Sequence, residues 1–141
     1  MRRFEKILMP VDLGHESSWQ EALPVAVDQA RHAGAELHIV TVVPEEPPQL
    51  AWLPKDYSDK MIAYVKPKLA KLVEAHVPAD VKSQQHVRQG SIYREIVVLA
   101  QEQDIDLIVM ASHRPELQDF LLGPNAARVV RHAECSVMVV R

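Results

Sequence analysis

Short apolar runs alternate with longer amphipathic stretches along the whole chain. The runs are rich in β-branched residues, and most are nearly continuous, as is typical of strands that are covered on both faces. They predict five strands, at residues 6–11, 37–43, 81–88, 106–111 and 136–141. In the stretches between them, apolar residues recur at helical spacing. These stretches predict four helices, at about residues 16–33, 57–76, 92–103 and 124–132.

Strands that alternate with helices in this way are typical of parallel crossover units, which place helices on both faces of a sheet. Because such crossovers are right-handed, the sequence predicts an α/β fold: a three-layer, doubly wound, Rossmann-like sandwich around a five-stranded parallel sheet. A chain of 141 residues has the length of one ordinary domain. We therefore expect residues 1–141 to form a single domain.

Proline, glycine and serine mark the expected ends of the helices. Pro24 lies within the first helical stretch, so that helix either begins late or is kinked. Gly34 is suited to end the same helix, and Ser91 to cap the third. Pro124 fits the first position of the fourth helix, where its missing N–H has no partner in any case. Residues 44–54 contain four prolines and are expected to form a loop.

The charge of the chain argues against nucleic acid as a partner. The formal net charge is −3, and no basic block is longer than Arg2-Arg3. The apolar start is broken by Pro10 and Asp12, so it does not match a signal peptide, and no apolar run approaches the ~20 residues of a membrane span. We expect a cytoplasmic protein that is not inserted in a membrane.

Few residues suggest metal or thiol chemistry. None of the seven histidines pairs with another at i, i+4 spacing, so a metal held by the protein is not expected. Cys135 is the single cysteine and is expected to be a buried free thiol. A His-x-Gly-His sequence after the first strand and a P-loop Gly-Lys-Ser sequence are both missing, which argues against an adenylating enzyme or a flavin electron carrier.

The fold itself indicates where a ligand would bind. In open α/β sheets, ligands bind at the C-terminal ends of the strands, where the winding direction reverses. This rule selects the loops around residues 10–12, 42–43 and 111–125. The turn at Gly123 leads into a helix N-terminus, whose free N–H groups favour phosphate. Almost every doubly wound protein has such a turn, so this signal is weak by itself.

Three segments carry a resemblance to a known family. They are KILMPVD near the start, GSIYREIVVLAQEQDIDLIVM in the middle, and DLIVMASHRPELQDFLLGPNAARVVRHAECSVMVVR at the end. The chain resembles the universal stress proteins of the UspA type over nearly its whole length, least across residues 44–81. The resemblance implies an adenine nucleotide alpha hydrolase-like sheet that binds ATP.

The resemblance also implies a role for individual residues of the three loops. From the residues alone, Val42 and Met110 could equally be core residues, and Asp12 could simply cap its own loop. The implied positions are Pro10, Val11 and Asp12 at the base and ribose; Val42 against the adenine; Met110, Ala111 and His113 along the near wall; and Arg114, Gly123, Asn125 and Ala126 at the phosphates.

In the family's glycine motif, two residues separate the first glycine from the second, nine residues separate the second from the third, and Ser or Thr follows the third. The chain departs from this motif. Ala111 and Arg114 stand at the first two glycines, and Pro124 replaces the hydroxyl residue after Gly123. Either the site is a variant in which Arg114 and Asn125 hold the phosphates, or phosphate binding has been lost.

Two functions follow from these alternatives. The first is an ATP-binding regulatory protein of the stress response, to which Mg²⁺ would come with the phosphates. No catalytic residue is evident, so we expect at most slow ATP hydrolysis. The second is a nucleotide-free interaction module of the same fold.

The resemblance and the expected topology also suggest partners. The final strand, Val137 to Val140, is expected near an edge of the sheet, and an unpaired apolar edge favours a homodimer. The residues from Ser112 to Asn125 resemble family members that accompany transporters, so a membrane transporter component is a further candidate. Trp52 and Leu53, in the proline-rich loop, could form another contact, a lid over the nucleotide, or a surface without function.

Overall fold

The protein is described by a computed structural model that covers residues 3–45, 52, 55–112 and 124–141. Its centre is a sheet of five parallel strands in the order β3-β2-β1-β4-β5. The chain winds outward from β1 to β3, then crosses back to β4, so the winding direction reverses between β1 and β4. The strands are β1 (Lys6–Pro10), β2 (Glu36–Val43), β3 (Ser83–Gln89), β4 (Leu107–Ala111) and β5 (Ser136–Val140).

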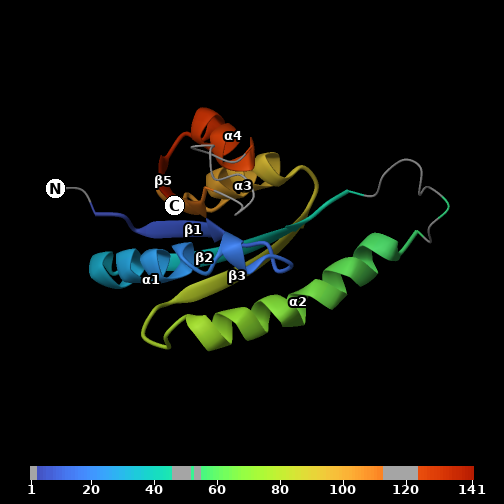
Figure 1. Cartoon of the computed structure of the whole chain (residues 1–141), viewed down its shortest axis with the longest axis horizontal. Helices are drawn as coiled ribbons and strands as arrows, with labels where there is room; N and C mark the ends of the chain where they lie inside the picture. The colour runs from blue at the N-terminus through green and yellow to red at the C-terminus, as the bar shows by residue number, and fades with distance from the viewer. Residues whose placement is uncertain (1–2, 46–51, 53–54, 113–123) are drawn as a thin grey trace.

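Helices cover both faces of the sheet, which confirms the predicted three-layer α/β fold. Figure 1 shows α1 and α2 on one face and α3 and α4 on the other. Within the described residues, no helix is long and apolar enough to cross a membrane. The helices are α1 (Ala22–Ala33), α2 (Tyr57–His76), α3 (Ile92–Glu102) and α4 (Pro124–His132), and a short 3₁₀ turn, η1, spans Glu16–Ser18.

Alternation along the strands divides the interior into two apolar clusters. In β1, Ile7 and Met9 belong to the cluster beneath α1 and α2, while Leu8 belongs to the cluster beneath α3 and α4. All three side chains are fully buried. A strand that buries both of its faces has no polar alternation, which is why β1, β2 and β4 appear as continuous apolar runs in the sequence.

Most of the predicted helix ends are confirmed, and two details differ. The first helix begins late, at Ala22, which places Pro24 in the first turn, where the ring is tolerated. Gly34 ends it in the left-handed conformation, with φ of 67°. Ser91 stands at the N-cap of α3, but its side chain makes no capping hydrogen bond. Cys135 is free but only half-buried, because it lies in the short connection between α4 and β5.

The two central strands are joined by residues that are far apart in the sequence. The carboxylate of Asp106 accepts hydrogen bonds from the backbone N–H groups of Glu5 and Lys6, at 2.8 and 3.1 Å. Ile7 and Leu107 then begin the β1–β4 pairing. This contact fixes the register of β1 against β4, and therefore the relative positions of the loops that follow the two strands.

Candidate functional site

A pocket of about 240 Å³ lies at the C-terminal ends of β1 and β4, where the winding direction reverses. Its volume is slightly below the ~300–1,000 Å³ that is typical of small-molecule sites. The walls come from the loop after β1, η1, the end of β2, α3, the end of β4 and the start of α4. The lining residues are Pro10, Val11, Asp12, His15, Ser17, Ser18, Val42, Pro44, Ile92, Ile96, Met110, Ala111, Ser112, Pro124, Asn125 and Ala126.

The described candidates from the sequence all meet in this pocket. Eight of the eleven residues belong to the described part of the chain, and each of them lines the cavity. The other three, His113, Arg114 and Gly123, lie outside the described residues. The eight are Pro10, Val11, Asp12, Val42, Met110, Ala111, Asn125 and Ala126.

The floor of the pocket is continuous with the core. Met110 and Ala126 are members of the buried cluster beneath α3 and α4, and Val42 packs against that cluster. Val42 and Met110 therefore both pack against the interior and also line the pocket, and their contact with a ligand stays a prediction. A site built on packed side chains of this kind is largely formed before any ligand arrives.

Asp12 organises the loop that forms one rim. Its Oδ1 accepts a hydrogen bond from the N–H of Gly14 at 2.9 Å, and its Oδ2 lies 2.9 Å from Nδ1 of His15. The hydroxyl of Ser18 accepts from the N–H of Asp12 at 2.8 Å and lies 2.7 Å from the carbonyl oxygen of His15. Both carboxylate oxygens thus have partners within the loop that follows β1, which agrees with the capping alternative for Asp12.

Several pocket residues were missed by the sequence analysis. His15, Ser17 and Ser18 enter through the 3₁₀ turn, which occupies part of a stretch that was predicted as helix. Ile92 and Ile96 enter from α3, one turn apart on the same helix face. Their i, i+4 apolar spacing is visible in the sequence, but it is equally typical of any core-facing helix.

Polar and apolar side chains both line the pocket. Asp12, His15, Ser17 and Ser18 line it beside β1, whereas Ser112 and Asn125 line it beside β4 and α4. Val42, Ile96 and Met110 are among the apolar lining residues, and Val42 lies on the side of β1 away from β4, because β2 and β4 flank β1 on opposite sides. Such a cavity offers a small ligand both apolar contacts and a few polar groups.

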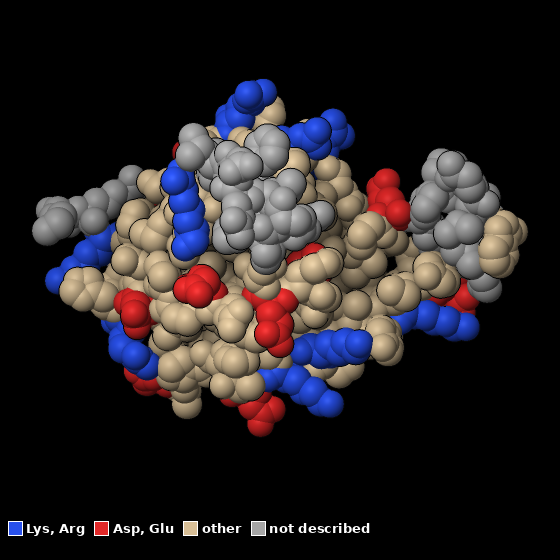
Figure 2. All heavy atoms as spheres, viewed as in Figure 1, with Lys and Arg blue, Asp and Glu red and all other residues tan. Residues whose placement is uncertain are grey.

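The described residues offer no metal-binding cluster, and the face drawn in Figure 2 has no large patch of one charge. Among residues 3–45, 52, 55–112 and 124–141, no group of three or more His, Cys, Asp and Glu side chains is placed to hold a metal ion. On the face shown in Figure 2, basic and acidic side chains are interspersed.

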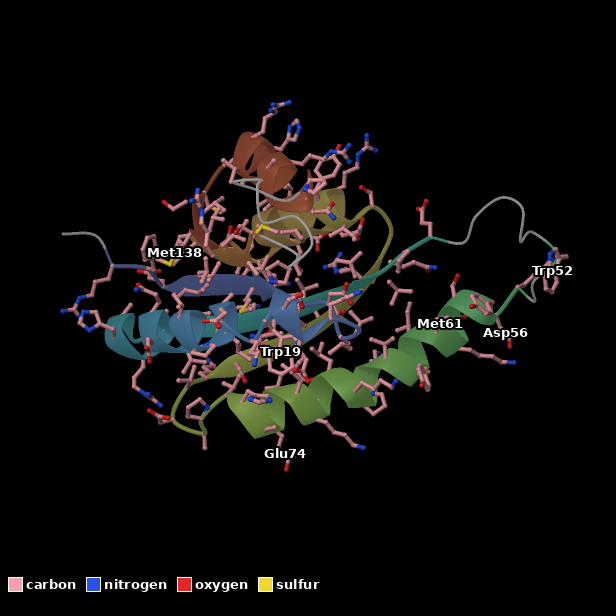
Figure 3. All side chains as sticks on the ribbon, in the orientation of Figure 1. Trp19, Trp52, Asp56, Met61, Glu74 and Met138 are labelled. Atoms are coloured by element: carbon pink, nitrogen blue, oxygen red, sulfur yellow. The ribbon has the colours of Figure 1, made fainter. Side chains whose placement is uncertain are left out.

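Trp52 lies away from this site. Figure 3 shows it beyond the N-terminal end of α2, at a distance from the body of the domain, and its side chain is 76% exposed. It does not line the pocket, although Pro44, at the start of the same loop, does. Leu53 lies outside the described residues.

Comparisons with known proteins agree on one family. The family model described as Universal stress protein family matches residues 3–141. "Universal stress protein G" of Shigella flexneri is 30% identical over 142 residues, which cover 98% of this chain and 99% of the relative. The solved structure of universal stress protein UspA from Lactobacillus plantarum has a TM-score of 0.80 at 27% identity, and it covers the whole of both chains.

Two further similar structures contain nucleotides. A universal stress protein in complex with cAMP has a TM-score of 0.66 at 21% identity, covering 99% of this chain and 98% of the other. The universal stress protein from Archaeoglobus fulgidus in complex with dAMP also has a TM-score of 0.66, at 16% identity, covering 99% of this chain and the whole of the other. At these identities the likeness shows the shared fold.

Proposed function

The chain belongs to the universal stress protein family, and from this premise we propose that it binds an adenine nucleotide, ATP in the first place, in the pocket between β1, β4, α3 and α4. The observation that carries the proposal is the convergence of eight residues, from the ends of β1, β2 and β4 and the start of α4, on one cavity at the reversal of the winding. The cAMP and dAMP complexes of similar proteins support the same class of ligand.

The arrangement of the pocket suggests how the nucleotide lies in it. The base lies against apolar lining residues, Val42 and Met110 among them, and Asp12 lies toward the base and ribose. The phosphates lie at the start of α4, where the first-turn N–H groups and the positive end of the helix favour negative charge. Mg²⁺ would accompany the phosphates. We expect a regulatory role, with ATP hydrolysis slow at most.

Asn125→Asp tests this arrangement. The substitution changes size little, and an acidic residue in the first turn of a helix stabilises it, so α4 is expected to remain folded. The new carboxylate faces the phosphates at close range, and two like charges in a partly buried site repel by more than 1 kcal/mol. We expect an ATP dissociation constant at least about tenfold higher by isothermal titration of nucleotide-free protein, and a smaller change for AMP.

Adenosine is the matched control ligand because it has no phosphate. Its affinity should be the same for the wild type and for Asn125→Asp. If wild-type protein gives no heat and no thermal shift with millimolar ATP, the nucleotide proposal fails. The departures at Ala111 and Pro124 from the glycine motif would then favour the interaction module.

We also propose that the protein is a homodimer through β5. This strand is an edge of the sheet, with a free side opposite β4. Val140 uses its backbone toward β4, since its carbonyl oxygen accepts from the N–H of Ser112 at 2.9 Å. Because successive residues of a strand point their backbone groups to opposite sides, the N–H of Val139 points to the free edge.

Val139→Pro should therefore block edge pairing while preserving the β4–β5 ladder, because proline is tolerated where an edge N–H faces outward. We expect a dimer for the wild type and a monomer for the variant by sedimentation velocity at micromolar concentration. The variant's circular dichroism spectrum should match that of the wild type. A wild-type protein that sediments as a monomer would contradict the proposal.

A transporter component remains a candidate partner, and it would be tested by binding measurements with the purified dimer.

A further inference from the structure

The outer face of α2 carries a row of lysines around one tyrosine. Leu69 and Val73 are the buried residues of this helix, so its opposite face points away from the sheet. Side chains that follow one another at spacings of three or four residues share one face of a helix. The residues that recur at these spacings on the outer face are Lys60, Tyr64, Lys68 and Lys71, which we call the lysine row.

The side chains of the lysine row are open to solvent. The side chain of Lys60 is 73% exposed, Tyr64 is 60% exposed, and Lys68 and Lys71 are exposed as well. The ammonium of Lys68 lies 4.2 Å from the centre of the Tyr64 ring, which is a cation–π distance. Among the described residues, the one ion pair of the row joins Nζ of Lys60 to Oδ2 of Asp56 at 3.2 Å. The other two lysines keep their charge free for a partner.

The charge of α2 is opposite in sign to that of the whole chain. Four lysines and two acidic residues give the helix a net charge of +2, whereas the chain has a net charge of −3, both with histidine neutral. The two acids do not interrupt the row, because Asp59 lies on another face and Glu74 lies beyond Lys71, at the edge of the row. An anionic surface would therefore attract this side of the molecule and repel the remainder, which orients the protein.

The shape of the outer face suits a flat partner. Lys60 and Lys71 are eleven residues apart, which is about 16 Å along a helix axis. Figure 1 shows α2 along the outside of the domain, with its N-terminal half extending past the sheet. A convex row of this kind can approach a plane along its whole length. Tyr64 adds a ring of the type that prefers the boundary between lipid and water.

We propose that the lysine row docks the protein on a bilayer surface that contains anionic lipids, with Tyr64 at the level of the headgroups. The lysines contact lipid phosphates, and α2 lies along the surface without crossing it. The attraction is electrostatic, so the docking is reversible and depends on salt. This inference is independent of the nucleotide binding and of the dimer proposed above.

Sedimentation of the full chain with vesicles tests the docking. We expect the wild type to bind vesicles of phosphatidylcholine and phosphatidylglycerol at low salt, but not vesicles of phosphatidylcholine alone. One basic residue near an anionic surface strengthens binding about fivefold, so Lys68→Glu should weaken binding by at least about that factor. Salt at about 1 M should release the wild type, because the Debye length is then only about 3 Å.

Lys66→Glu is the matched control, since Lys66 is an exposed lysine of the same helix that lies on another face. Both variants change the net charge of the protein equally, so only the position of the charge differs. We expect Lys66→Glu to weaken binding by less than about twofold, because its charge lies farther from the surface. Tyr64→Ala should weaken binding more than Lys66→Glu, because it removes the ring from the headgroup layer. Circular dichroism verifies that each variant is folded.

The outcomes separate the docking from its alternatives. If the wild type does not sediment with the anionic vesicles at low salt, the proposal fails. It also fails if Lys66→Glu weakens binding as much as Lys68→Glu, or if vesicles of phosphatidylcholine alone bind equally well. A wild type that binds a single-stranded oligonucleotide but not the vesicles would show that the row recognises nucleic acid, which also overturns the proposal.

Discussion

Replacing Ile96 with alanine is expected to lower the free energy of unfolding by about 2–5 kcal/mol, because the side chain is fully buried in the cluster beneath α3 and α4. Loss of the side chain removes buried apolar surface and leaves a cavity next to the pocket that it helps to line. The measurement is equilibrium unfolding in urea, followed by circular dichroism. Adenine nucleotide affinity, measured in parallel, should also fall.

Ile92→Ala is the matched control on the same helix. Ile92 lines the pocket one turn earlier but is 38% exposed, so its truncation should cost less than about 1 kcal/mol of stability. Both variants remove the same atoms from the pocket wall. If the two variants lower the free energy of unfolding equally, the conclusion that the pocket floor is continuous with the core is wrong.

Acid is expected to destabilise the fold through a histidine pair between β2 and β3. Nδ1 of the buried His38 lies 2.8 Å from Nε2 of His86, and Nε2 of His38 lies 2.7 Å from Oε1 of Glu36. One of the two facing ring nitrogens must carry the hydrogen of the His38–His86 contact, and the other must accept it. Protonation of both rings would leave this contact without an acceptor.

The two histidines hold their protons less tightly in the folded protein than in the unfolded chain. Burial lowers the pKa of His38, although Glu36 opposes this effect; Lys6 lowers the pKa further. Burial also lowers the pKa of His86, helped by His38 and Arg88 and opposed by Glu102 and Glu36. The unfolded chain therefore binds more protons, so stability is fully present above about pH 6.5 and falls as the pH drops below that value toward the folded-state pKa values.

Urea unfolding at pH 7.5 and at pH 5.0 measures this effect. We expect a lower midpoint for the wild type at pH 5.0 and a clearly smaller difference for His86→Gln, whose amide can still donate to His38 but does not titrate in this range. Gln85→Ala, at an exposed position of the same strand, should leave the pH difference unchanged. An equal pH difference in the wild type and in His86→Gln would contradict the assignment.

The fold could be predicted because its signals are local and agree with one another. The continuous apolar runs of β1 and β4 indicate strands that are buried on both faces, and Gly34 and Pro124 occupy the helix ends that their backbone chemistry favours. The sequence alone could not distinguish a late start of α1 from a kink within it, because Pro24 is compatible with both. The interior of α2 was less predictable: apolar residues recur along it at helical spacing, yet Tyr64 is exposed, and Leu69 and Val73 are its buried residues.

The site was predictable only where the topology rule or the resemblance reached it. Asp12 lies just after β1, and Val42 and Met110 lie close to the C-terminal ends of β2 and β4. The rule that ligands bind at the C-terminal ends of parallel strands therefore selects all three. The positions of His15 and Ser18 in the pocket depend on the 3₁₀ turn. They could not be predicted, because this turn contains the same residue types as the start of a helix. Ser112 adjoins Ala111 in the sequence, yet only three-dimensional packing shows that its hydroxyl is buried without a hydrogen-bond partner among the described residues.

The pairing of β1 with β4 also has a consequence for how the protein is made. Glu5 and Asp106 are 101 positions apart, and the strands that they align form the seam on which the pocket is built. While a ribosome is still synthesising the middle of the chain, β1 and β2 can pair, but one side of β1 has no neighbour. The pocket can therefore form only after β4 and α4 have emerged, and contacts of such high sequence separation make this last step a slow one.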